Sequence, residues 1–263
     1  MSSCKVIAVS SCKGGVGKST VAANLGLALT KRGRRVLLVD LDLGMRCLDL
    51  ILGLEDRAVY DIQDVVHNGV PLKRSIVQSD QSERLYLCAA PFQAEVHFDT
   101  QRFQEAVCKE AQALGFDYLF LDTPGDMGHP FVLACSLCEM ALVVATHGPT
   151  AIRAAERTGQ AATDRGVRQS LLVINNFDIR DKKHIAAGER AGVLDIIDKT
   201  YLPLLGVVPY DENFARAQEQ GALVSALPGT NVAAAFDNMA ARIEGQATVL
   251  FHNFKKISRK KLV

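Results

Sequence analysis

The chain has 263 residues, 48% of them hydrophobic, and a formal net charge of +1. This length is enough for one large α/β domain with a sizeable core, so no disulfide or metal is needed to hold the fold together. No apolar run approaches the ~18 residues that a membrane-spanning helix requires, which argues against an integral membrane protein.

The two ends of the sequence differ in character. The N-terminal residues lead straight into the strand-like run Val6-Ile-Ala-Val, with no pattern typical of a secretory signal, and the seven cysteines are an odd number. We therefore expect reduced thiols in a cytoplasmic protein. Beyond Glu244 there are five basic residues and no acidic one. The tail is thus strongly basic, and the rest of the chain carries a net charge of about −4.

Short apolar runs alternate with longer amphipathic stretches along the chain. The runs typical of buried strands are residues 5–10, 35–40, 85–89, 118–122, 141–146, 170–175 and 204–209. The helical patterns between them are residues 19–32, 100–114, 130–138, 150–163, 192–199 and 231–244. This alternation predicts an α/β fold with a doubly wound, mostly parallel sheet flanked by helices on both faces. We expect one domain over residues 1–246 and a separate tail over residues 247–263.

A glycine-rich loop joins the first predicted strand to the first predicted helix, in the sequence Ser10-Ser-Cys-Lys-Gly-Gly-Val-Gly-Lys-Ser-Thr20. Its glycines let the backbone wrap closely around phosphate oxygens, and the helix that follows adds the positive end of its dipole. In such a P-loop, Lys18 reaches the β- and γ-phosphates, Ser19 places its hydroxyl on Mg²⁺, and Thr20 hydrogen-bonds the α-phosphate. The strict P-loop pattern has glycine where this chain has Cys12. The predicted nucleotide-binding residues of the loop are Lys13, Gly14, Gly15, Val16, Gly17, Lys18, Ser19 and Thr20.

The spacing of the two lysines, in Lys-Gly-Gly-x-Gly-Lys-Ser, resembles the deviant Walker A motif of the MinD/ParA class of P-loop ATPases. The resemblance implies a P-loop NTPase fold, ATP and Mg²⁺ as cofactors, and catalytic roles for Lys13 and Lys18. In that class the early lysine reaches across a dimer to the phosphates bound by the partner subunit. Lys13 is therefore expected to make ATP part of a homodimer interface, where a further cation neutralises charge on the transferred phosphoryl group.

Two acidic residues follow the second predicted strand, in Val36-Leu-Leu-Val-Asp-Leu-Asp. Alternation along a strand places Asp40 and Asp42 on the same side. Beside a P-loop this pattern favours metal and water chemistry over an ordinary strand-end turn, where Asp is also common. The family resemblance implies that Asp42 is the switch I residue that positions the attacking water, and that Asp40 supports the Mg²⁺ shell.

The stretch after these acidic residues narrows the family. Gly44-Met-Arg-Cys-Leu-Asp, followed later by Val59-Tyr-Asp, is similar to Gly-Leu-Arg-Asn-Leu-Asp and Val-Tyr-Asp in the MinD branch, the bacterial septum-site ATPases. Partition ATPases of the ParA branch usually carry an Asp-Pro-Gln sequence there, whereas flagellar-number ATPases share much of the pattern. The resemblance runs from Lys5 to about Glu244 and implies a division inhibitor and an ATPase activator as partners.

A third acidic residue ends a predicted buried strand, in Tyr118-Leu-Phe-Leu-Asp-Thr-Pro. Asp122 is expected to hold Mg²⁺ through water, in the Walker B role. The family has a glycine two residues after this proline, whose amide senses the γ-phosphate in switch II. This chain has Asp126 at that position, with glycines instead at Gly125 and Gly128. The sequence therefore departs from the family pattern in the switch II loop, whereas the role expected for Asp122 is unaffected.

Two further segments resemble parts of the family that contact the adenine base. The strand that ends in Ile174-Asn-Asn resembles the adenine-reading strand, which implies that Asn175 or, as a second candidate, Asn176 contacts the base. An amide offers the donor and the acceptor that adenine requires. Pro209 is expected to pack on the base from the loop that follows the next strand. A strand that simply ends in turn-forming Asn is the alternative explanation for Asn176.

Cys135 and Cys138 form a C-x-x-C pair within a helical apolar pattern. Some relatives in this class carry iron–sulfur clusters, but buried cysteine behaves as a small hydrophobic side chain, and that is the role we expect here. A cluster shared across a dimer is the alternative.

The basic tail has an amphipathic pattern if it is taken as a helix. Its apolar arc contains Leu250, Phe251, Phe254, Ile257 and Leu262, and its opposite arc contains Lys255, Lys256, Arg259 and Lys260. This composition is typical of a helix that lies in an anionic membrane interface, where each basic residue contributes ~1 kcal/mol. MinD proteins end in such a helix. A disordered basic tail and a segment that contacts nucleic-acid phosphates are the alternatives.

Together with these features, the resemblance to the MinD branch implies a dimerising, Mg²⁺-dependent ATPase that binds the inner face of the cell membrane reversibly from the cytoplasm and positions the division septum. One short helix binds lipid weakly, whereas two helices held in an ATP-bound dimer bind more tightly through effective concentration. No sequence-specific nucleic acid is expected as a partner. Partition, flagellar positioning and iron–sulfur transfer are the alternative functions.

Overall fold

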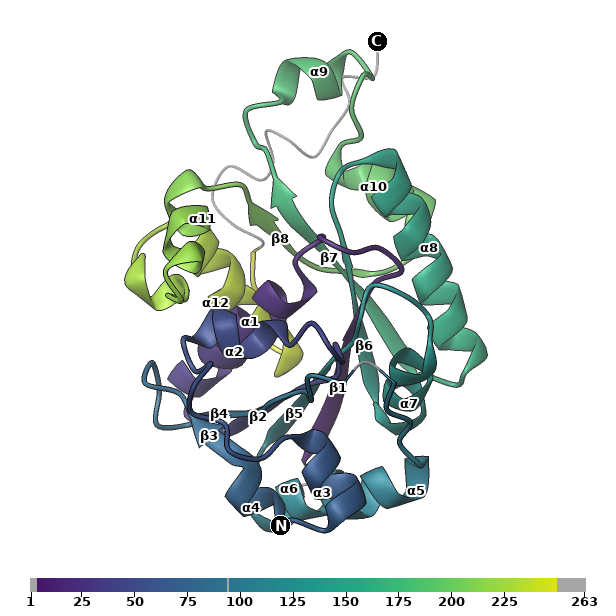
Figure 1. Ribbon diagram of the computed structural model, residues 1–263. Helices are drawn as coiled ribbons and strands as arrows, with labels where there is room; N and C mark the ends of the chain where they lie inside the picture. The colour runs from purple at the N-terminus through teal and green to yellow at the C-terminus, as the bar shows by residue number, and fades with distance from the viewer. Residues whose placement is uncertain (1–3, 94, 250–263) are drawn as a thin grey trace.

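An eight-stranded sheet in the order β3-β4-β2-β5-β1-β6-β7-β8 forms the centre of the protein, in a computed structural model that describes residues 4–93 and 95–249 (Figure 1). The strands are β1 (Lys5–Ser10), β2 (Val36–Asp40), β3 (Ile76–Gln78), β4 (Leu85–Cys88), β5 (Tyr118–Asp122), β6 (Met140–Ala145), β7 (Gln169–Phe177) and β8 (Leu204–Pro209). All neighbouring pairs are parallel except the edge pair β3–β4. This confirms the predicted fold class.

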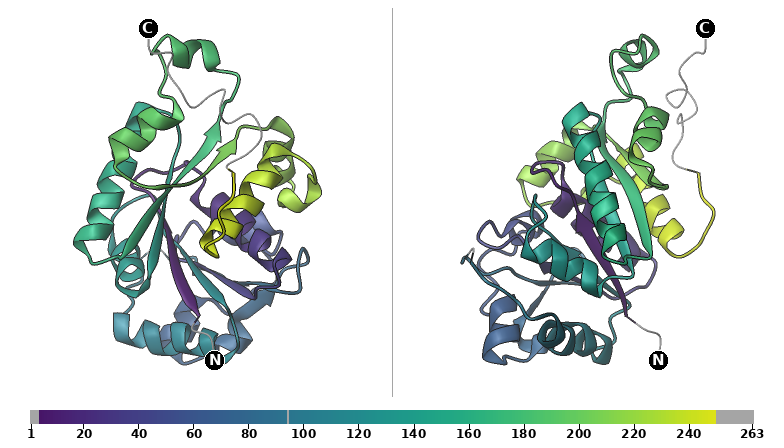
Figure 2. Two further views of the ribbon diagram at one scale, coloured as in Figure 1. Left: turned by 180° about the vertical axis from the view of Figure 1, so that it is seen from behind. Right: turned by 90° about the vertical axis from the view of Figure 1, so that its right-hand side faces the viewer.

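Helices cover both faces of the sheet (Figure 2). Alternate residues of β1 separate the two faces, because Ile7 packs into one hydrophobic cluster and Val6 into another. The first face carries α1 (Lys18–Lys31), α2 (Cys47–Leu52), α11 (Glu212–Glu219), the 3₁₀ turn η2 (Val224–Ala226) and α12 (Asn231–Ile243). The second carries α3 (Ile62–Asn68), α4 (Leu72–Ser75), α5 (Thr100–Phe103), the π-helical η1 (Gln104–Lys109), α6 (Glu110–Ala113), α7 (His129–Leu137), α8 (Pro149–Asp164), α9 (Lys182–Ala186) and α10 (Val193–Thr200).

The elements predicted from apolar periodicity are all present, with bounds that differ by at most two residues. The predicted helix over residues 100–114 is continuous but passes through the π-helical segment η1. The elements that the sequence did not suggest are short. The four residues of α4 and the three of β3, for example, cannot display a period of 3.6 or several alternations. Tertiary contacts, rather than a local pattern, define these elements.

The sheet gathers the ends of three central strands at one edge. Asp40 at the end of β2 pairs in register with Asp122 at the end of β5, and Asp122 also pairs with Val9, which precedes the P-loop in β1. In a parallel sheet the carboxyl ends of the strands share one edge, which is where ligands of such folds bind. No helix within residues 4–93 and 95–249 is long and apolar enough to cross a bilayer. The predicted membrane-facing residues Leu250, Phe251, Phe254, Lys255, Lys256 and Ile257 lie outside the described residues.

Candidate active site

The P-loop connects β1 to α1 and ends in a left-handed glycine. Gly17 has φ +89° at the N-cap of α1, a conformation that a side chain would strain. A Cβ atom at this position would also lie 2.2 Å from Nδ2 of Asn175. Lys18, the first residue of α1, is only 6% exposed. The loop therefore needs glycine for two independent reasons, and it places a buried lysine at a helix N-terminus where anions bind.

Asn175 holds the P-loop from the far side. Its Nδ2 donates to the carbonyl oxygen of Val16 at 2.9 Å, and the side chain is buried. The next residue, Asn176, is exposed and has φ +55°, within an irregular stretch of the β7–β8 pairing. Both residues line a hollow of about 210 Å³ together with the P-loop, Pro209 and the start of α11. The adenine contacts predicted for Asn175 and Pro209 stay predictions, and Asn175 also positions the loop.

The second lysine of the motif is held by a hydroxyl group. Nζ of Lys13 donates to Oγ1 of Thr150 at 2.8 Å, at the N-terminus of α8. About two turns further along α8, the fully buried Thr158 accepts from the backbone N–H of Cys12 at 2.9 Å and donates to the carbonyl oxygen of Ala154 at 2.7 Å. Helix α8 thus supports the part of the loop in which the sequence departs from the strict P-loop pattern.

The two aspartates at the strand ends differ in their hydrogen bonds. Both oxygens of Asp40 accept backbone N–H groups, from Asp42 and from Leu48, each at 2.9 Å. Both oxygens of Asp122 are buried without a hydrogen-bond partner of ordinary geometry, although the Ser19 hydroxyl lies beside them. Asp40 therefore fixes the turn that leads to α2, a task that the sequence did not suggest, and its place in a Mg²⁺ shell stays a prediction.

Asp40, Asp42 and Asp122 form an acidic centre, and burial is the largest influence on the pKa of each of them. It raises the pKa of Asp40 to about 7, against the two N–H donors that lower it. Burial and then the charge of Asp40 raise the pKa of Asp122 well above its usual value, while Ser19 and Lys18 lower it. The pKa of Asp42 is also raised, first by burial, with Lys18 opposing the shift. Buried carboxylates that lack partners are costly unless a cation neutralises them, so the residues present fit a Mg²⁺ ion beside Asp122 and Ser19.

The departure in switch II has a steric explanation. A Cβ atom on Gly125 would lie 2.8 Å from the backbone nitrogen of Gly14 and 2.9 Å from its Cα, so the switch II backbone touches the P-loop. Asp126 is exposed, and its Oδ1 accepts from the backbone N–H of Gly128 at 2.7 Å. Its charge also raises the pKa of Asp42. The close approach of the two loops is thus made at Gly125, one residue before the position where the family has glycine.

A buried ion pair fixes the segment after switch I. Arg46 is 6% exposed, has φ +48°, and donates from Nε to Oδ2 of Asp49. Its backbone N–H donates to the carbonyl oxygen of Asp42 at 2.9 Å, and Phe92 covers its guanidinium group at 4.4 Å. In the sequence, Arg46 and Asp49 were only part of the stretch that resembles the MinD branch. The structure makes them the link between switch I and α2.

Other side chains of the site could not be found from spacing along the chain. Nε2 of Gln218, in α11, donates to Oγ1 of Thr20 at 3.0 Å across a separation of 198 residues. Thr150 and Thr158 reach the loop from α8 in the same way. These residues lie in helices whose sequences carry no motif, so the sequence offered no signal for them.

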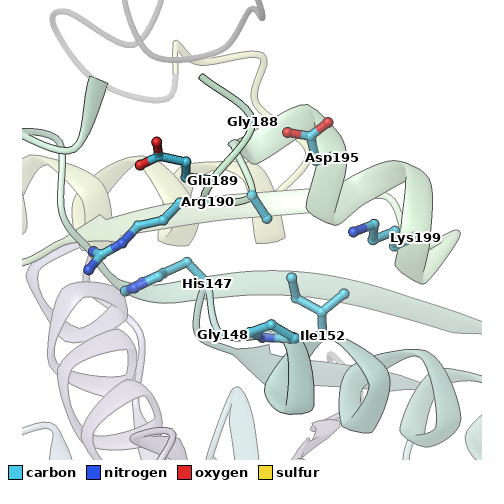
Figure 3. A pocket seen from close by; sticks show the side chains of 10 residues that line it. His147, Gly148, Ile152, Gly188, Glu189, Arg190, Asp195 and Lys199 are labelled. Carbon is cyan, nitrogen blue, oxygen red and sulfur yellow. The ribbon is translucent and has the colours of Figure 1, made fainter. Parts of the chain in front are cut away.

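A larger hollow of about 490 Å³ lies on the other face of the sheet, between α8 and α10 (Figure 3). Two of its charged residues have side-chain partners, because Glu189 is hydrogen-bonded to Nδ1 of His184 and Arg190 forms an ion pair with Asp181. Its lining contains no P-loop residue, whereas Gly15, Val16 and Gly17 line the smaller hollow. We therefore assign nucleotide binding to the smaller hollow, and metal binding to the carboxylate of Asp122 near Ser19.

The C-x-x-C pair belongs to the core. Cys135 is 3% exposed and Cys138 is half-buried, and both pack in the cluster under α7. Burial raises the pKa of Cys135 to about 11 and that of Cys138 to about 12, which keeps both thiols protonated. Within residues 4–93 and 95–249 no three His, Cys, Asp or Glu side chains are grouped so that they could hold a metal ion. The pair fills core space, as expected for small hydrophobic side chains.

Comparison with known proteins gives consistent matches over most of the chain. The sequence model of the ParA family, described as NUBPL iron-transfer P-loop NTPase, matches residues 3–244. The septum site-determining protein MinD of Thermotoga maritima is 35% identical over 257 residues, which cover 97% of this chain and 93% of that protein.

Two solved structures extend these matches to the fold. The MinC:MinD cell division protein complex of Aquifex aeolicus contains a chain with a TM-score of 0.84 and 30% identity, covering 94% of this chain and 98% of that one. MinD complexed with Mg-ADP from Pyrococcus horikoshii OT3 has a TM-score of 0.74 and 25% identity, covering 91% and 96%.

Proposed function

This chain belongs to the ParA family of P-loop NTPases and, within it, to the MinD septum site-determining proteins, and on that premise we propose that it is a Mg²⁺-dependent ATPase that acts as a nucleotide-gated switch in placing the division septum. The observation that carries the proposal is the acidic centre beside the P-loop. Asp122 presents two buried, unpartnered oxygens next to Ser19 and the buried Lys18. A site of this kind is stable when a cation and phosphates complete it.

The chain's own groups supply positioning and charge, which are what phosphoryl transfer requires. The P-loop N–H groups and Lys18 bind the phosphates, and Asp42 orients the attacking water. Burial raises the pKa of Asp42, so its carboxylate is a better proton acceptor than an exposed one. Ser19 and Asp122 would hold Mg²⁺, which supplies positive charge against the phosphate oxygens.

Dimerisation is the second part of the proposal. Lys13 is held by the hydroxyl of Thr150 rather than by a carboxylate, so that partner leaves its charge unneutralised. A half-buried lysine with a neutral partner, five residues before Lys18, supports a role in binding phosphates of a second subunit. ATP would then bridge two copies of the chain, and hydrolysis would separate them.

Membrane binding and protein partners complete the proposal. The tail over residues 247–263 follows α12 and carries the apolar and basic arcs described above. Two tails in one ATP-bound dimer would bind an anionic bilayer much more tightly than one, because the second contact is made at high effective concentration. The complex of a similar chain with MinC supports a division inhibitor as partner. An activator of hydrolysis is proposed from the family.

The test is sedimentation with liposomes rich in phosphatidylglycerol, with ATP and with ADP. The full chain is compared with a chain that ends at Gln246, and basal ATP hydrolysis is measured for both. We expect the full chain to sediment with ATP and not with ADP, and the shortened chain to hydrolyse ATP without sedimenting. If both chains hydrolysed ATP and neither sedimented with the liposomes, the proposed ATPase activity would stand and the proposed membrane binding would be wrong. Absence of nucleotide binding by either chain would overturn the whole proposal.

A further inference from the structure

One side chain outside the P-loop makes direct contact with a residue predicted to bind phosphate. Nε2 of Gln218 donates to Oγ1 of Thr20 at 3.0 Å, and Thr20 is the residue expected at the α-phosphate. Gln218 is half-buried and lies in the lining of the same hollow of about 210 Å³ as Thr20 and Gly17. The contact therefore lies within the proposed nucleotide site and not on a remote surface.

The direction of this hydrogen bond matters for binding. A hydroxyl that accepts a hydrogen bond still has its own proton to donate. With Gln218 donating to its oxygen, Thr20 can donate to an α-phosphate oxygen, so that amide, hydroxyl and phosphate form one chain. Hydrogen bonds in such a chain polarise and strengthen each other. Gln218 thus both orients the Thr20 hydroxyl and makes it a better donor.

A second hydrogen-bonded path ties the same region to α1. Nδ2 of the fully buried Asn24 donates to the carbonyl oxygen of Thr20 at 2.8 Å, and its Oδ1 accepts from the backbone N–H of Val224 at 2.7 Å. The segment from α11 to η2 is therefore attached to the start of α1 at two points. The Val224 contact is made to a buried side chain of α1, whereas the Gln218 contact is made inside the hollow.

The N-terminal half of α11 is fixed independently of the P-loop. Asp211 caps the helix by accepting from the backbone N–H groups of Asn213 and Phe214, at 2.9 and 3.2 Å. The Phe214 ring is buried and lies 6.2 Å from the ring of Phe236 in α12. Loss of Gln218 should therefore release the C-terminal half of α11 without unfolding the helix start.

We propose that Gln218 is a positioning residue of the nucleotide site, which couples occupancy of the α-phosphate subsite to the order of α11 through the Thr20 hydroxyl. The inference rests on the proposed ATPase function and specifies which part of the nucleotide α11 senses. Because ATP and ADP share the α-phosphate, α11 responds to either nucleotide. The γ-phosphate is sensed elsewhere, where switch I and switch II meet the P-loop.

The test compares Gln218→Ala and Gln218→Glu with Gln220→Ala, an exposed glutamine at the end of the same helix. Affinities for ADP and for a slowly hydrolysed ATP analogue are measured by calorimetry, and kcat and KM for ATP by phosphate release. A hydrogen bond of ordinary net strength predicts that Gln218→Ala weakens both nucleotides by the same factor, roughly 3- to 10-fold. Its KM should rise by a similar factor, with kcat within about 2-fold of the wild type, because the contact does not involve the transferred phosphoryl group. Gln218→Glu should lose more, because a carboxylate cannot donate to Thr20 and repels the phosphates.

Hydrogen exchange supplies a readout that a purely structural role would not change. We expect ADP to protect the amides of residues 215–219 in the wild type and in Gln220→Ala, and to protect them less in Gln218→Ala. Equal affinities and equal ADP-dependent protection in Gln218→Ala and Gln220→Ala would overturn the inference. Lys18→Ala separates this failure from failure of the proposed function. If the wild type binds nucleotide and Lys18→Ala does not, the ATPase proposal stands whatever Gln218 does.

Discussion

Asp40 and Asp122 occupy paired positions at the ends of neighbouring strands, and both are fully buried. The backbone satisfies the oxygens of Asp40, whereas those of Asp122 have no ordinary hydrogen-bond partner. The charge of Asp40 raises the pKa of its neighbour further. A protein that keeps such a pair without a cation does so at a cost to its stability, and this cost makes the acidic centre testable.

The first prediction concerns the pH dependence of stability. Burial raises the pKa of Asp40 from 3.8 to about 7, and that of Asp122 also rises, so between these values the folded state binds more protons than the unfolded one. The free energy of unfolding in the absence of Mg²⁺ and nucleotide should therefore fall as the pH rises from about 4 through 7. Asp122→Asn removes one of the two carboxylates and should therefore make this fall less steep.

Urea unfolding between pH 5 and pH 8 in EDTA measures the effect. The variants are compared by how steeply the free energy of unfolding changes with pH. Its absolute value is not compared, because the buried amide of Asp122→Asn has unsatisfied polar groups that lower stability at every pH. Asp122→Ala serves as a second variant without such groups. Slopes equal to that of the wild type in both variants would contradict the assignment of the buried charge.

The second prediction concerns the contact between switch II and the P-loop. In Gly125→Ala the new methyl group would meet the backbone of Gly14 at less than 3 Å, so one of the two loops must shift. We expect ATP hydrolysis to fall by at least 10-fold, because small displacements of reacting groups are costly, and the unfolding free energy to fall by about 1–3 kcal/mol. Gly148→Ala is the control, since a Cβ atom there meets nothing within 4 Å. If Gly125→Ala hydrolysed ATP at the wild-type rate, the close contact between switch II and the P-loop would not be needed for hydrolysis.

The third prediction concerns the buried ion pair behind switch I. Arg46→Met leaves the carboxylate of Asp49 buried without its partner, which should cost about 3–5 kcal/mol of unfolding free energy. The double variant Arg46→Met, Asp49→Leu removes both charges and should recover most of that loss. Chemical denaturation of Arg46→Met, Asp49→Leu and the double variant measures these values. If the double variant were as unstable as the sum of the two single ones, the pair would not act as a unit.

The fourth prediction concerns Lys13 and rests on the proposed dimer. Lys13→Ala should keep the affinity of the monomer for ATP within about 3-fold, because Lys18 and the loop backbone remain, but should abolish ATP-dependent dimerisation in sedimentation velocity. Lys31→Ala is the control, since Lys31 is an exposed lysine at the other end of α1, 3.7 Å from Asp237. If Lys13→Ala formed dimers at the same ATP concentrations as the wild type, Lys13 would not be the residue that reaches the phosphates of the partner subunit.

Much of the fold could be predicted because strong local patterns carry it. The runs that became β1, β5 and β8 were predicted with the bounds that the structure has, since nearly continuous apolar residues mark strands buried on both faces. Elements such as α2, α4 and β3 were missed, because a few residues display no period and are held by contacts with distant segments.

The functional site divides in the same way. The sequence by itself determined which loop is predicted to bind phosphate, because that prediction needs only glycines, a lysine and a hydroxyl close together in one short segment. Only the tertiary structure decided which distant side chains support that segment. Gln218 reaches Thr20 and Asn175 reaches Val16 across 198 and 159 residues. Hydrogen bonds are directional and only about 3 Å long, so partners this far apart in the chain exist only once the sheet has brought their strands and helices together.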